Sequence, residues 1–408
     1  MRDHELYAKI LGVQSPWFVA RVELALKDGE IDVYLEHAPE TRWPCPQCEQ
    51  SCSVYDHQPA RQWRHLDTCQ YRTIIHASPP RIDCPEHGAL VVCLPWAEAN
   101  SRFSTLFEAL AIDWLGAASQ SAVARILRLS WDEIHAIMER AVRRGLARRC
   151  AEPIPYVGVD EKAARKGHNY LTIVNDLQRS RVLYVAQERT AASLDGFWPT
   201  LSAEQRDSIR AVCVDMWDPF VNSIRSNVPT AEVVYDKFHI AKHLGEAVDL
   251  VRRAENRALR SAGDGRLIGT KYDWLKNPAS FTSSGWRDFR SLRESDLKTA
   301  RAWALKESAM RLFDYHYAGV ARRYFTQWYF WATHSRLKPV IKVARMLKGR
   351  FENVITYLRH RITNATSESL NARIQWVKFT ARGYRNVKNF ITAIYFHCGG
   401  LDLKPLPT

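Results

Sequence analysis

The sequence has no apolar run of about 18 residues, the length at which a helix could cross a bilayer. Its first residues, Met1-Arg2-Asp3-His4-Glu5, carry no apolar core of the kind found in secretory signal peptides. Acidic residues are also in short supply, since 44 Asp and Glu face 58 Lys and Arg and leave a net charge of +14. We therefore predict a cytoplasmic protein without a membrane partner. The excess of positive charge favours a polyanionic partner such as nucleic acid.

The nine cysteines are an odd number and do not suggest a disulfide scaffold. Cys45 and Cys48 form a CxxC pair, and Cys84 and His87 form a CxxH pair that begins 36 residues after Cys48. Two such chelating pairs are the usual construction of a closed tetrahedral zinc site, so we predict structural Zn²⁺ in a reducing cytosol. Three further cysteines lie nearby and could replace one of these ligands: Cys52, Cys69 and Cys93.

A β-hairpin is predicted before the zinc ligands, because apolar residues alternate over residues 17–38 around a turn at Asp28-Gly29. Between the two chelating pairs, the segment Arg61-Gln62-Trp63-Arg64-His65-Leu66 mixes bases with an aromatic residue. Two interpretations stay open for it: contact with DNA, or packing of the zinc module. At 408 residues the whole chain suggests two or three domains.

Residues 103–149 have helical periodicity. The first helix places Phe103, Leu106, Leu110 and Trp114 on one apolar face. A short helix over 121–127, a turn, and a third helix capped by Ser130 have the outline of a helix-turn-helix. The third helix ends in five arginines, at positions 140, 143, 144, 148 and 149. The alternative is a plain three-helix bundle with a solvated basic end.

From residue 155 the pattern changes to strands, and three of them end in an acid: Asp160, Asp215 and Asp236. The Asp160 strand is followed by strands at 169–174 and 181–187, which predicts three consecutive antiparallel strands. The next two strands alternate with helices, so the sheet is mixed and the Asp160 and Asp215 strands can lie side by side. Clustered carboxylates repel each other, which favours a divalent cation at this edge. The alternative for a single strand is an Asp that caps the following helix.

After Phe238 the chain is helical for about 120 residues and rich in bases and tryptophan. Such aromatics can stack on unpaired nucleotides, although a Trp-rich helical stripe is more often core. Near the end, Ser367 or Thr366 is predicted to cap a helix that carries Glu368 in its first turn and Asn371 on the same face. A basic run follows: Lys378, Arg382, Arg385 and Lys388.

The set Asp160, Asp215 and Glu368, on two strands and a late helix, resembles the DDE triad of transposases with a ribonuclease-H-like fold. The Cys45/Cys48/Cys84/His87 ribbon and four short motifs narrow the resemblance. These motifs are Trp63-Arg64-His65-Leu66, Asp160-Glu161-Lys162, Asp236-Lys237-Phe238-His239 and Arg382-Gly383-Tyr384-Arg385-Asn386. Together they are similar to the ISL-three family of bacterial insertion-sequence transposases over almost the whole chain. Glu368-Ser369 stands where the family usually has Glu-Gly, a difference that changes no ligand atom.

The resemblance implies a multidomain α+β protein: a zinc-ribbon β module, a helix-turn-helix, and a ribonuclease-H-like mixed α/β catalytic domain with an all-α insertion. The expected domains are residues 1–98, 99–150, 151–244 (first part of the catalytic core), 245–355 (the insertion) and 356–408 (last part of the core, with Glu368).

The resemblance also implies catalysis. Asp160, Asp215 and Glu368 would hold two Mg²⁺ or Mn²⁺ ions for DNA cleavage and strand transfer, and Asp236 and His239 would form a paired motif near the scissile phosphate. Expected partners are double-stranded DNA (terminal inverted repeats and target) and further copies of the chain, in a bacterial, nucleoid-associated location. The residues expected to contact DNA are basic: Arg64, Arg125, Arg128, Arg140, Arg143, Arg144, Lys378, Arg382 and Arg385. Two other functions stay open: a DNA-binding regulator that no longer cuts, and a metal-dependent nuclease without strand transfer.

Overall fold

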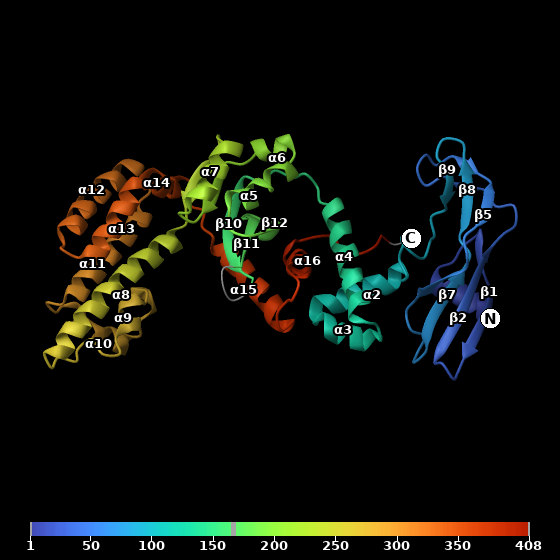
Figure 1. Ribbon diagram of the computed structural model, residues 1–408, viewed down its shortest axis with the longest axis horizontal. Helices are drawn as coiled ribbons and strands as arrows, with labels where there is room; N and C mark the ends of the chain where they lie inside the picture. Colours follow the sequence, from blue (N-terminus) through green and yellow to red (C-terminus); the bar gives the residue numbers. More distant parts are fainter. Residues whose placement is uncertain (1, 165–168, 407–408) are drawn as a thin grey trace. The chain divides into compact units, whose positions relative to one another are not determined.

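The computed structural model describes residues 2–164 and 169–406, apart from the side chains of residues 365–368. The chain divides into two compact units, one with the residues up to Arg149 and those from Val377 onward, the other Cys150–Trp376. In the described part of the chain, no helix is both long and apolar enough to span a membrane. Figure 1 labels many of the elements of both units.

The N-terminal module of the first unit is built from small β-sheets (Figure 1), and one short helix packs against β1. The hairpin predicted over residues 17–38 is confirmed, and Gly29 takes a positive φ of 66° in its turn. The four-stranded sheet has the order β1-β2-β7-β6, the three-stranded sheet β5-β8-β9, and β3 pairs with β4. The elements are α1 (Asp3–Leu11), β1 (Trp17–Ala25), β2 (Glu30–His37), β3 (Trp43–Pro44), β4 (Ser51–Cys52), β5 (Val54–His57), β6 (Arg61–Arg64), β7 (Arg72–Ala77), β8 (Pro80–Cys84) and β9 (Gly88–Val91).

Four buried tryptophans, Trp17, Trp43, Trp63 and Trp96, hold the core of this module. The Trp17 ring lies 4.8 Å from the Trp96 ring and 5.4 Å from the Trp43 ring, and Trp63 packs edge-on against Trp96 at 5.6 Å. Aromatic rings at these separations add to the free energy gained from burying their area. Trp63 is fully buried, so packing of the module is the interpretation that the structure supports for the Arg61–Leu66 segment.

Three helices follow, as the sequence predicted: α2 (Thr105–Ala117), α3 (Gln120–Leu127) and α4 (Trp131–Ala147). Ser130 caps α4 and forms a capping box with Glu133, which ends the turn after α3. The predicted apolar face of the first helix is wrong, because Leu106, Leu110 and Trp114 are exposed while Phe107, Ala111 and Leu115 are buried. α2 is apolar around most of its circumference, so periodicity alone could not select the inward face.

The C-terminal helix α16 (Val387–Cys398) packs against α4 within this first unit. The predicted domain 356–408 is therefore corrected. The segment from Val377 onward groups with the N-terminal residues and not with the mixed sheet. The division falls inside α15 (Ala365–Thr380), a helix that a sequence pattern reads as one element.

The second unit contains a five-stranded mixed sheet with the order β12-β11-β10-β13-β14. β10, β11 and β12 are antiparallel, and β10, β13 and β14 are parallel, as predicted. Short helices connect the parallel strands, because each crossover must return the chain to the same end of the sheet. The elements are β10 (Tyr156–Ala163), β11 (Tyr170–Asp176), β12 (Arg181–Gln187), α5 (Ala191–Asp195), η1 (Trp198–Thr200), α6 (Ala203–Asp207), β13 (Ala211–Val214), α7 (Asp218–Asn227) and β14 (Glu232–Tyr235).

A helical bundle follows the last strand, with α8 beside α11 and α13 (Figure 1). Its last helix is fixed to the edge of the sheet, since Thr356 Oγ1 donates to the Val233 carbonyl at 2.6 Å. Sheet and bundle share one continuous apolar core. The helices are α8 (Lys237–Ser261), α9 (Lys271–Leu275), η2 (Pro278–Ser280), α10 (Ser283–Arg293), α11 (Lys298–Met310), η3 (Arg311–Asp314), α12 (Ala318–His334), α13 (Lys338–Gly349) and α14 (Phe351–His360).

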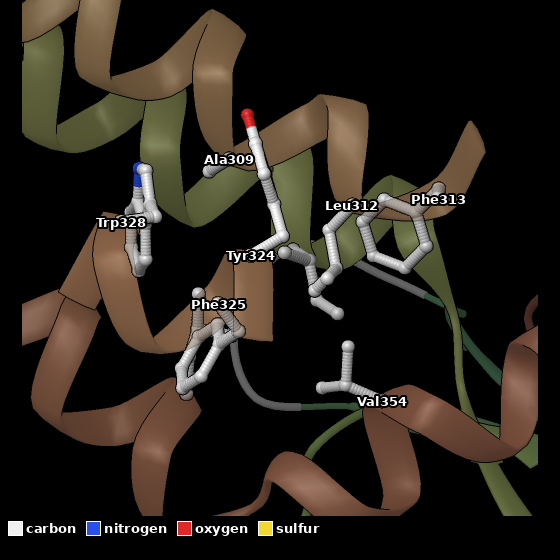
Figure 2. A pocket seen from close by; sticks show the side chains of 9 residues that line it. Ala309, Leu312, Phe313, Tyr324, Phe325, Trp328 and Val354 are labelled. Carbon is white, nitrogen blue, oxygen red and sulfur yellow. The ribbon is translucent and has the colours of Figure 1, made fainter. Parts of the chain in front are cut away.

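Most of the bundle's tryptophans belong to this core, as expected for a Trp-rich helical stripe. Trp274, Trp303 and Trp328 are buried, whereas Trp331 keeps 42% of its surface exposed. Figure 2 shows Trp328, Phe325 and Val354 converging on a pocket of about 10 Å³ in this core. A pocket this small and apolar gives a water molecule neither room nor polar partners, so it is a packing feature.

Candidate active site and metal centre

Asp160 and Asp215 lie at the same edge of the sheet. The parallel register pairs Gly158 with Cys213, so the two acids stand two residues beyond the same pair on neighbouring strands. Parallel strands bring their carboxyl ends together, which is why two acids 55 positions apart in sequence become neighbours. Asp160 belongs to the last part of β10, and Asp215 directly follows β13.

Asp160 is held by two hydrogen bonds. Its Oδ1 accepts from the Glu161 amide at 2.8 Å, and its Oδ2 accepts from Asn371 Nδ2 at 2.6 Å. Burial raises the pKa of Asp160 above its usual value, although both hydrogen bonds and the charge of His239 act in the opposite direction. A carboxylate in this position gains from a nearby cation, because a cation offsets the cost of its partial desolvation.

His239 connects two further acids. Its Nδ1 lies 3.3 Å from Asp236 Oδ2, and its Nε2 lies 3.9 Å from Asp215 Oδ2. The hydrogen bond with Asp236 raises the pKa of His239, and the charge of Asp215 adds to this shift. Asp236 is 3% exposed and caps α8 by accepting from the Phe238 amide. The contacts of Asp236 therefore agree with the alternative in which it caps the helix that carries His239.

Arg189, just beyond β12, brings a cation to these acids. It forms an ion pair with Glu161, and its Nη2 lies 3.9 Å from Asp215 Oδ2. Its guanidinium lies 4.3 Å from the centre of the Trp217 ring, a cation–π arrangement that fixes its direction. Burial raises the pKa of Glu161 to about 7, against the opposing charge of Arg189.

The side chain of Glu368 lies outside the described residues, and so do those of Thr366 and Ser367. The backbone of α15 begins at Ala365, before both predicted capping residues, so the prediction that Thr366 or Ser367 caps this helix is wrong. Asn364, which precedes the helix, donates to the Val159 carbonyl at 3.2 Å. Together with Asn371, it fastens the start of α15 to β10 beside Asp160.

Cys45, Cys48, Cys84 and His87 converge in the N-terminal module, with their ligand atoms within 4.8 Å of one another. The Sγ atoms of Cys48 and Cys84 are 3.7 Å apart, and Cys84 Sγ lies 3.5 Å from His87 Nδ1. Tetrahedral Zn²⁺ with its usual bond lengths would separate two sulfurs by about 3.8 Å, and a sulfur from a nitrogen by about 3.5 Å. The donor set therefore fits zinc in both chemistry and spacing.

Within the group, burial would raise the pKa of Cys84, but the hydrogen bonds with His87 and nearby backbone amides hold this pKa at about 6.

The other cysteines near this group do not join it. Cys52 is buried next to the group and donates to the Gln50 carbonyl, while Cys69 and Cys93 are exposed. Within the described residues, the cysteine–histidine group is the only set of three or more candidate ligands with metal-site geometry.

Three of the arginines expected to contact DNA have internal partners, and the structure speaks against that role. Arg64 is 9% exposed and pairs with Asp67. Arg140 and Arg144 both bind Glu108, which is 1% exposed, at 2.6 and 2.9 Å. Arginine's long side chain and fixed charge suit buried pairs as well as phosphates, so a basic run cannot separate the two roles.

The remaining predicted DNA contacts lie at the surface. Arg128 is exposed, and its guanidinium pairs with Asp67. Lys378 is half-buried, and four arginines are exposed: Arg125, Arg143, Arg382 and Arg385.

Sequence reasoning missed Arg189 and assigned no role to Glu161. Arg189 follows an apolar strand, as the acids do, so a search for polar residues at strand ends would have found it. Nothing in the sequence signals its orientation over Trp217, because the two residues come together only in the folded protein.

Models of known families match three consecutive parts of the chain. A DDE model of the ISL3 group, described as transposase, matches residues 157–394. The helix-turn-helix domain of transposase family ISL3 matches residues 92–142, and the zinc-finger of transposase IS204/IS1001/IS1096/IS1165 matches residues 41–87.

Full-length relatives agree with these matches. The chain is 26% identical over 422 residues to the transposase for insertion sequence element IS1557 of Mycobacterium tuberculosis, over 96% of this chain and 94% of that protein. It is 27% identical over 399 residues to the transposase for insertion sequence element IS1001 of Bordetella parapertussis, over 97% of this chain and 98% of that protein. The DDE match alone spans more than half of the chain. The protein therefore belongs to the ISL3 family of DDE transposases, enzymes that cleave DNA and transfer the cut strand.

Proposed function

We propose that Asp160, Asp215 and Glu368 are the catalytic acids of this transposase, in a core with the ribonuclease-H-like fold. The observation that carries the proposal is the placement of Asp160 and Asp215 on adjacent parallel strands, with α15 fastened beside them by Asn371. The strand order β12-β11-β10-β13-β14, with three antiparallel and then two parallel strands, supports the fold assignment. Glu368 lies one turn before Asn371 on the same helix, which supports its place next to Asp160.

The acids fit hard divalent cations, Mg²⁺ or Mn²⁺, because carboxylate oxygens are the ligands that these ions prefer. Asp160 in particular would gain from a cation. Burial raises the pKa of Asp160, and a nearby cation would favour its charged form. Bound there, two such ions would supply an activated attacking oxygen and charge stabilisation for the departing one. Asp160, Asp215 and Glu368 would hold these ions.

The neighbouring side chains position and neutralise the DNA strand. His239, 3.9 Å from Asp215, is placed to donate to a phosphate oxygen beside the acids, and Asp236 orients its ring. Arg189 carries a fixed charge at the same edge, and its pair with Glu161 can be exchanged for a phosphate. The attacking oxygen belongs to water in strand cleavage and to the freed 3′-hydroxyl in strand transfer.

The first unit is proposed to bind the ends of the mobile element. Zn²⁺ held by Cys45, Cys48, Cys84 and His87 would stabilise the N-terminal module, and the helix-turn-helix would lie in the major groove. Double-stranded terminal repeats and target DNA are the expected partners, with two or more copies of the chain on the DNA. The phosphate contacts proposed are five exposed arginines and the half-buried Lys378: Arg125, Arg128, Arg143, Arg382, Arg385 and Lys378.

We retain residues 1–98 and 99–150 as the zinc and helix-turn-helix domains, and 151–244 and 245–355 as the first part of the core and the helical insertion. The last part of the core is confined to residues 356–376, because the segment after it groups with the first unit. A location on the bacterial nucleoid would follow from DNA binding.

The test is cleavage and joining by three nearly isosteric variants: Asp160→Asn, Asp215→Asn and Glu368→Gln. Amides are poor Mg²⁺ ligands, so each variant should lose strand cleavage while binding of the element ends survives. A variant that cleaves at the wild-type rate removes its residue from the site. Wild-type protein should also yield joined product from a pre-cut end, and nicked product alone would identify a nuclease without strand transfer.

A further inference from the structure

The helical bundle contains a second site that the catalytic proposal does not use, a cleft of about 1050 Å³. Its walls come from the start of α8, the segment around η2, residues of α10, α11 and η3, and Trp331 of α12. Pockets for small ligands typically occupy about 300–1,000 Å³. This cleft therefore has room for a few nucleotides, in contrast to the closed apolar pocket of Figure 2.

Aromatic surface is available in this cleft. Phe238 is 56% exposed, Trp331 is 42% exposed, and Trp286 is half-buried. Arg293 lies 5.2 Å from the Trp286 ring, so one wall combines an aromatic face with a guanidinium. Flat rings beside cations are the arrangement on which proteins stack unpaired bases, whatever their sequence.

The charge of the lining favours an anion. Four cations, Lys237, Arg293, Lys306 and Arg311, face two acids, Glu307 and Asp314. Lys306 and Glu307 compensate each other in an ion pair of 2.7 Å. Lys237 and Arg311 have no ion pair within the described residues, so their charges are available to phosphate groups.

Helix α8 joins the cleft to the catalytic acids. Asp236 caps this helix and His239 lies in its first turn toward Asp215, while Phe238, Ala241 and Gly245 line the cleft on another side of the helix. Gly245 lies about 9 Å along the helix axis from His239, at 1.5 Å per residue. A strand held at the acids therefore needs little length to enter the cleft.

We propose that this cleft binds unpaired nucleotides of the DNA strand at the cleavage site. Their bases stack on Phe238, Trp286 and Trp331, and their phosphates contact Lys237 and Arg311. A duplex cannot make the same contacts in the cleft. The faces of its bases are covered by stacking, and its major groove alone is about 12 Å wide. The inference rests on the proposed catalytic site, which supplies the strand.

The test separates the two proposals by measuring binding without cleavage. Full-length protein carrying Asp160→Asn is titrated with a labelled single-stranded oligothymidylate and with a duplex of the same length. Trp331→Ala and Trp286→Ala should each weaken binding of the single strand about tenfold or more, since each stacked base contributes that much. Binding of the duplex should stay unchanged.

Matched controls decide whether the cleft is responsible. Phe330→Ala removes a 63% exposed ring from the same helix as Trp331 but outside the cleft, and it should change neither affinity. Arg311→Ala should reduce the salt dependence of single-strand binding, whereas the exposed Arg301 of α11, changed to Ala, should not. Trp331→Phe keeps a stacking surface and should restore most of the affinity.

Several outcomes would overturn the inference. One is wild-type affinity for the single strand in both tryptophan variants, and another is an equal loss for strand and duplex. If free thymidine monophosphate displaced the oligonucleotide at the same phosphate concentration, the cleft would be a mononucleotide pocket. If the variants changed self-association but not single-strand binding, the cleft would hold a second protein chain.

Discussion

Asn371 Nδ2 donates a 2.6 Å hydrogen bond to Asp160 Oδ2 and so joins helix α15 to strand β10 at a proposed catalytic acid. The two residues are 211 positions apart in the chain, and the helical bundle lies between them in sequence. The bond fixes α15 beside Asp160 at the position of Asn371.

Replacing Asn371 with Ala should lower the cleavage rate about 10- to 100-fold and raise the metal concentration needed for half-maximal rate. The reason is that partners which orient metal ligands typically affect metal affinity by this factor. The measurement is the cleavage rate as a function of Mg²⁺ concentration. Gln375→Ala, an exposed change on the same helix, is the control and should behave as wild type. An unchanged metal curve for Asn371→Ala would show that the bond does not position Asp160.

The roles of His239 and Asp236 can be separated by substitution. His239→Ala should lower cleavage about 10²-fold, by analogy with the loss of other donors to a developing negative charge, and should leave end binding intact. Asp236→Asn keeps a good N-cap for α8 but removes the negative partner of His239. We expect it to lower the cleavage rate without changing the melting temperature. If Asp236→Asn cleaves normally, Asp236 serves the helix alone.

Arg143 and Arg144 are neighbours on α4 with opposite expected effects. Arg143 is exposed, so Arg143→Ala should reduce the slope of log affinity against log salt by about 1 and leave stability unchanged. Arg144 is 8% exposed and paired with Glu108 and Glu98, so Arg144→Ala should destabilise the first unit by about 3–5 kcal/mol. Urea unfolding and DNA titrations at several salt concentrations measure both. Equal effects on DNA affinity in folded protein would contradict the internal role of Arg144.

Loss of zinc should unfold the N-terminal module, because metal binding supplies a large part of the folding energy of such modules. Cys45→Ser and Cys48→Ser should release the metal, as measured by elemental analysis. Both variants should also lose the near-ultraviolet signal of the buried tryptophans. Cys69 is exposed and is not among the four converging ligands, so Cys69→Ser should retain zinc. Purified wild-type protein without zinc would contradict the assignment, and loss of zinc in Cys52→Ser would add that residue to the ligands.

Acid should destabilise the first unit through His65, which is buried and bonded to Ser104 at 2.8 Å. Burial, with a smaller contribution from the charge of Arg64, lowers the pKa of His65 from 6.5 to about 4. Below pH 6.5 the unfolded chain therefore binds a proton that the folded chain does not. The contribution of neutral His65 to the free energy of unfolding is present above pH 6.5. It is lost as the pH falls to about 4, by a total on the order of 3 kcal/mol.

The measurement is the free energy of unfolding at several pH values between 7 and 4, compared with that of His65→Asn. The Asn side chain can keep a hydrogen bond to Ser104 but does not titrate. Acid release of zinc would affect both proteins equally, so the difference between their curves isolates His65. Parallel curves would show that His65 does not contribute.

The sequence by itself determined most of the local elements, and it predicted which acids stand at the ends of the strands. Alternating and β-branched residues predicted the strands of the sheet, the spacing of cysteines and His87 predicted the zinc group, and the short motifs around Asp160 and Asp236 indicated the family. These signals are local, because strand periodicity and chelate spacing depend on residues close together in the chain.

Only the tertiary structure decided which charges are internal and which are available. Arg143 and Arg144 are adjacent and chemically identical, yet Glu108 on another helix makes one of them a buried ion-pair partner. Likewise α2 is apolar on several sides, and the packing of its neighbours selected Phe107 and Ala111 over Leu106 and Leu110. The placement of Arg189 over Trp217, of Asn371 on Asp160, and of the segment after Val377 in the first unit also depends on residues far apart in sequence. Such contacts form only when the chain folds, because burial and pairing are properties of neighbours in space.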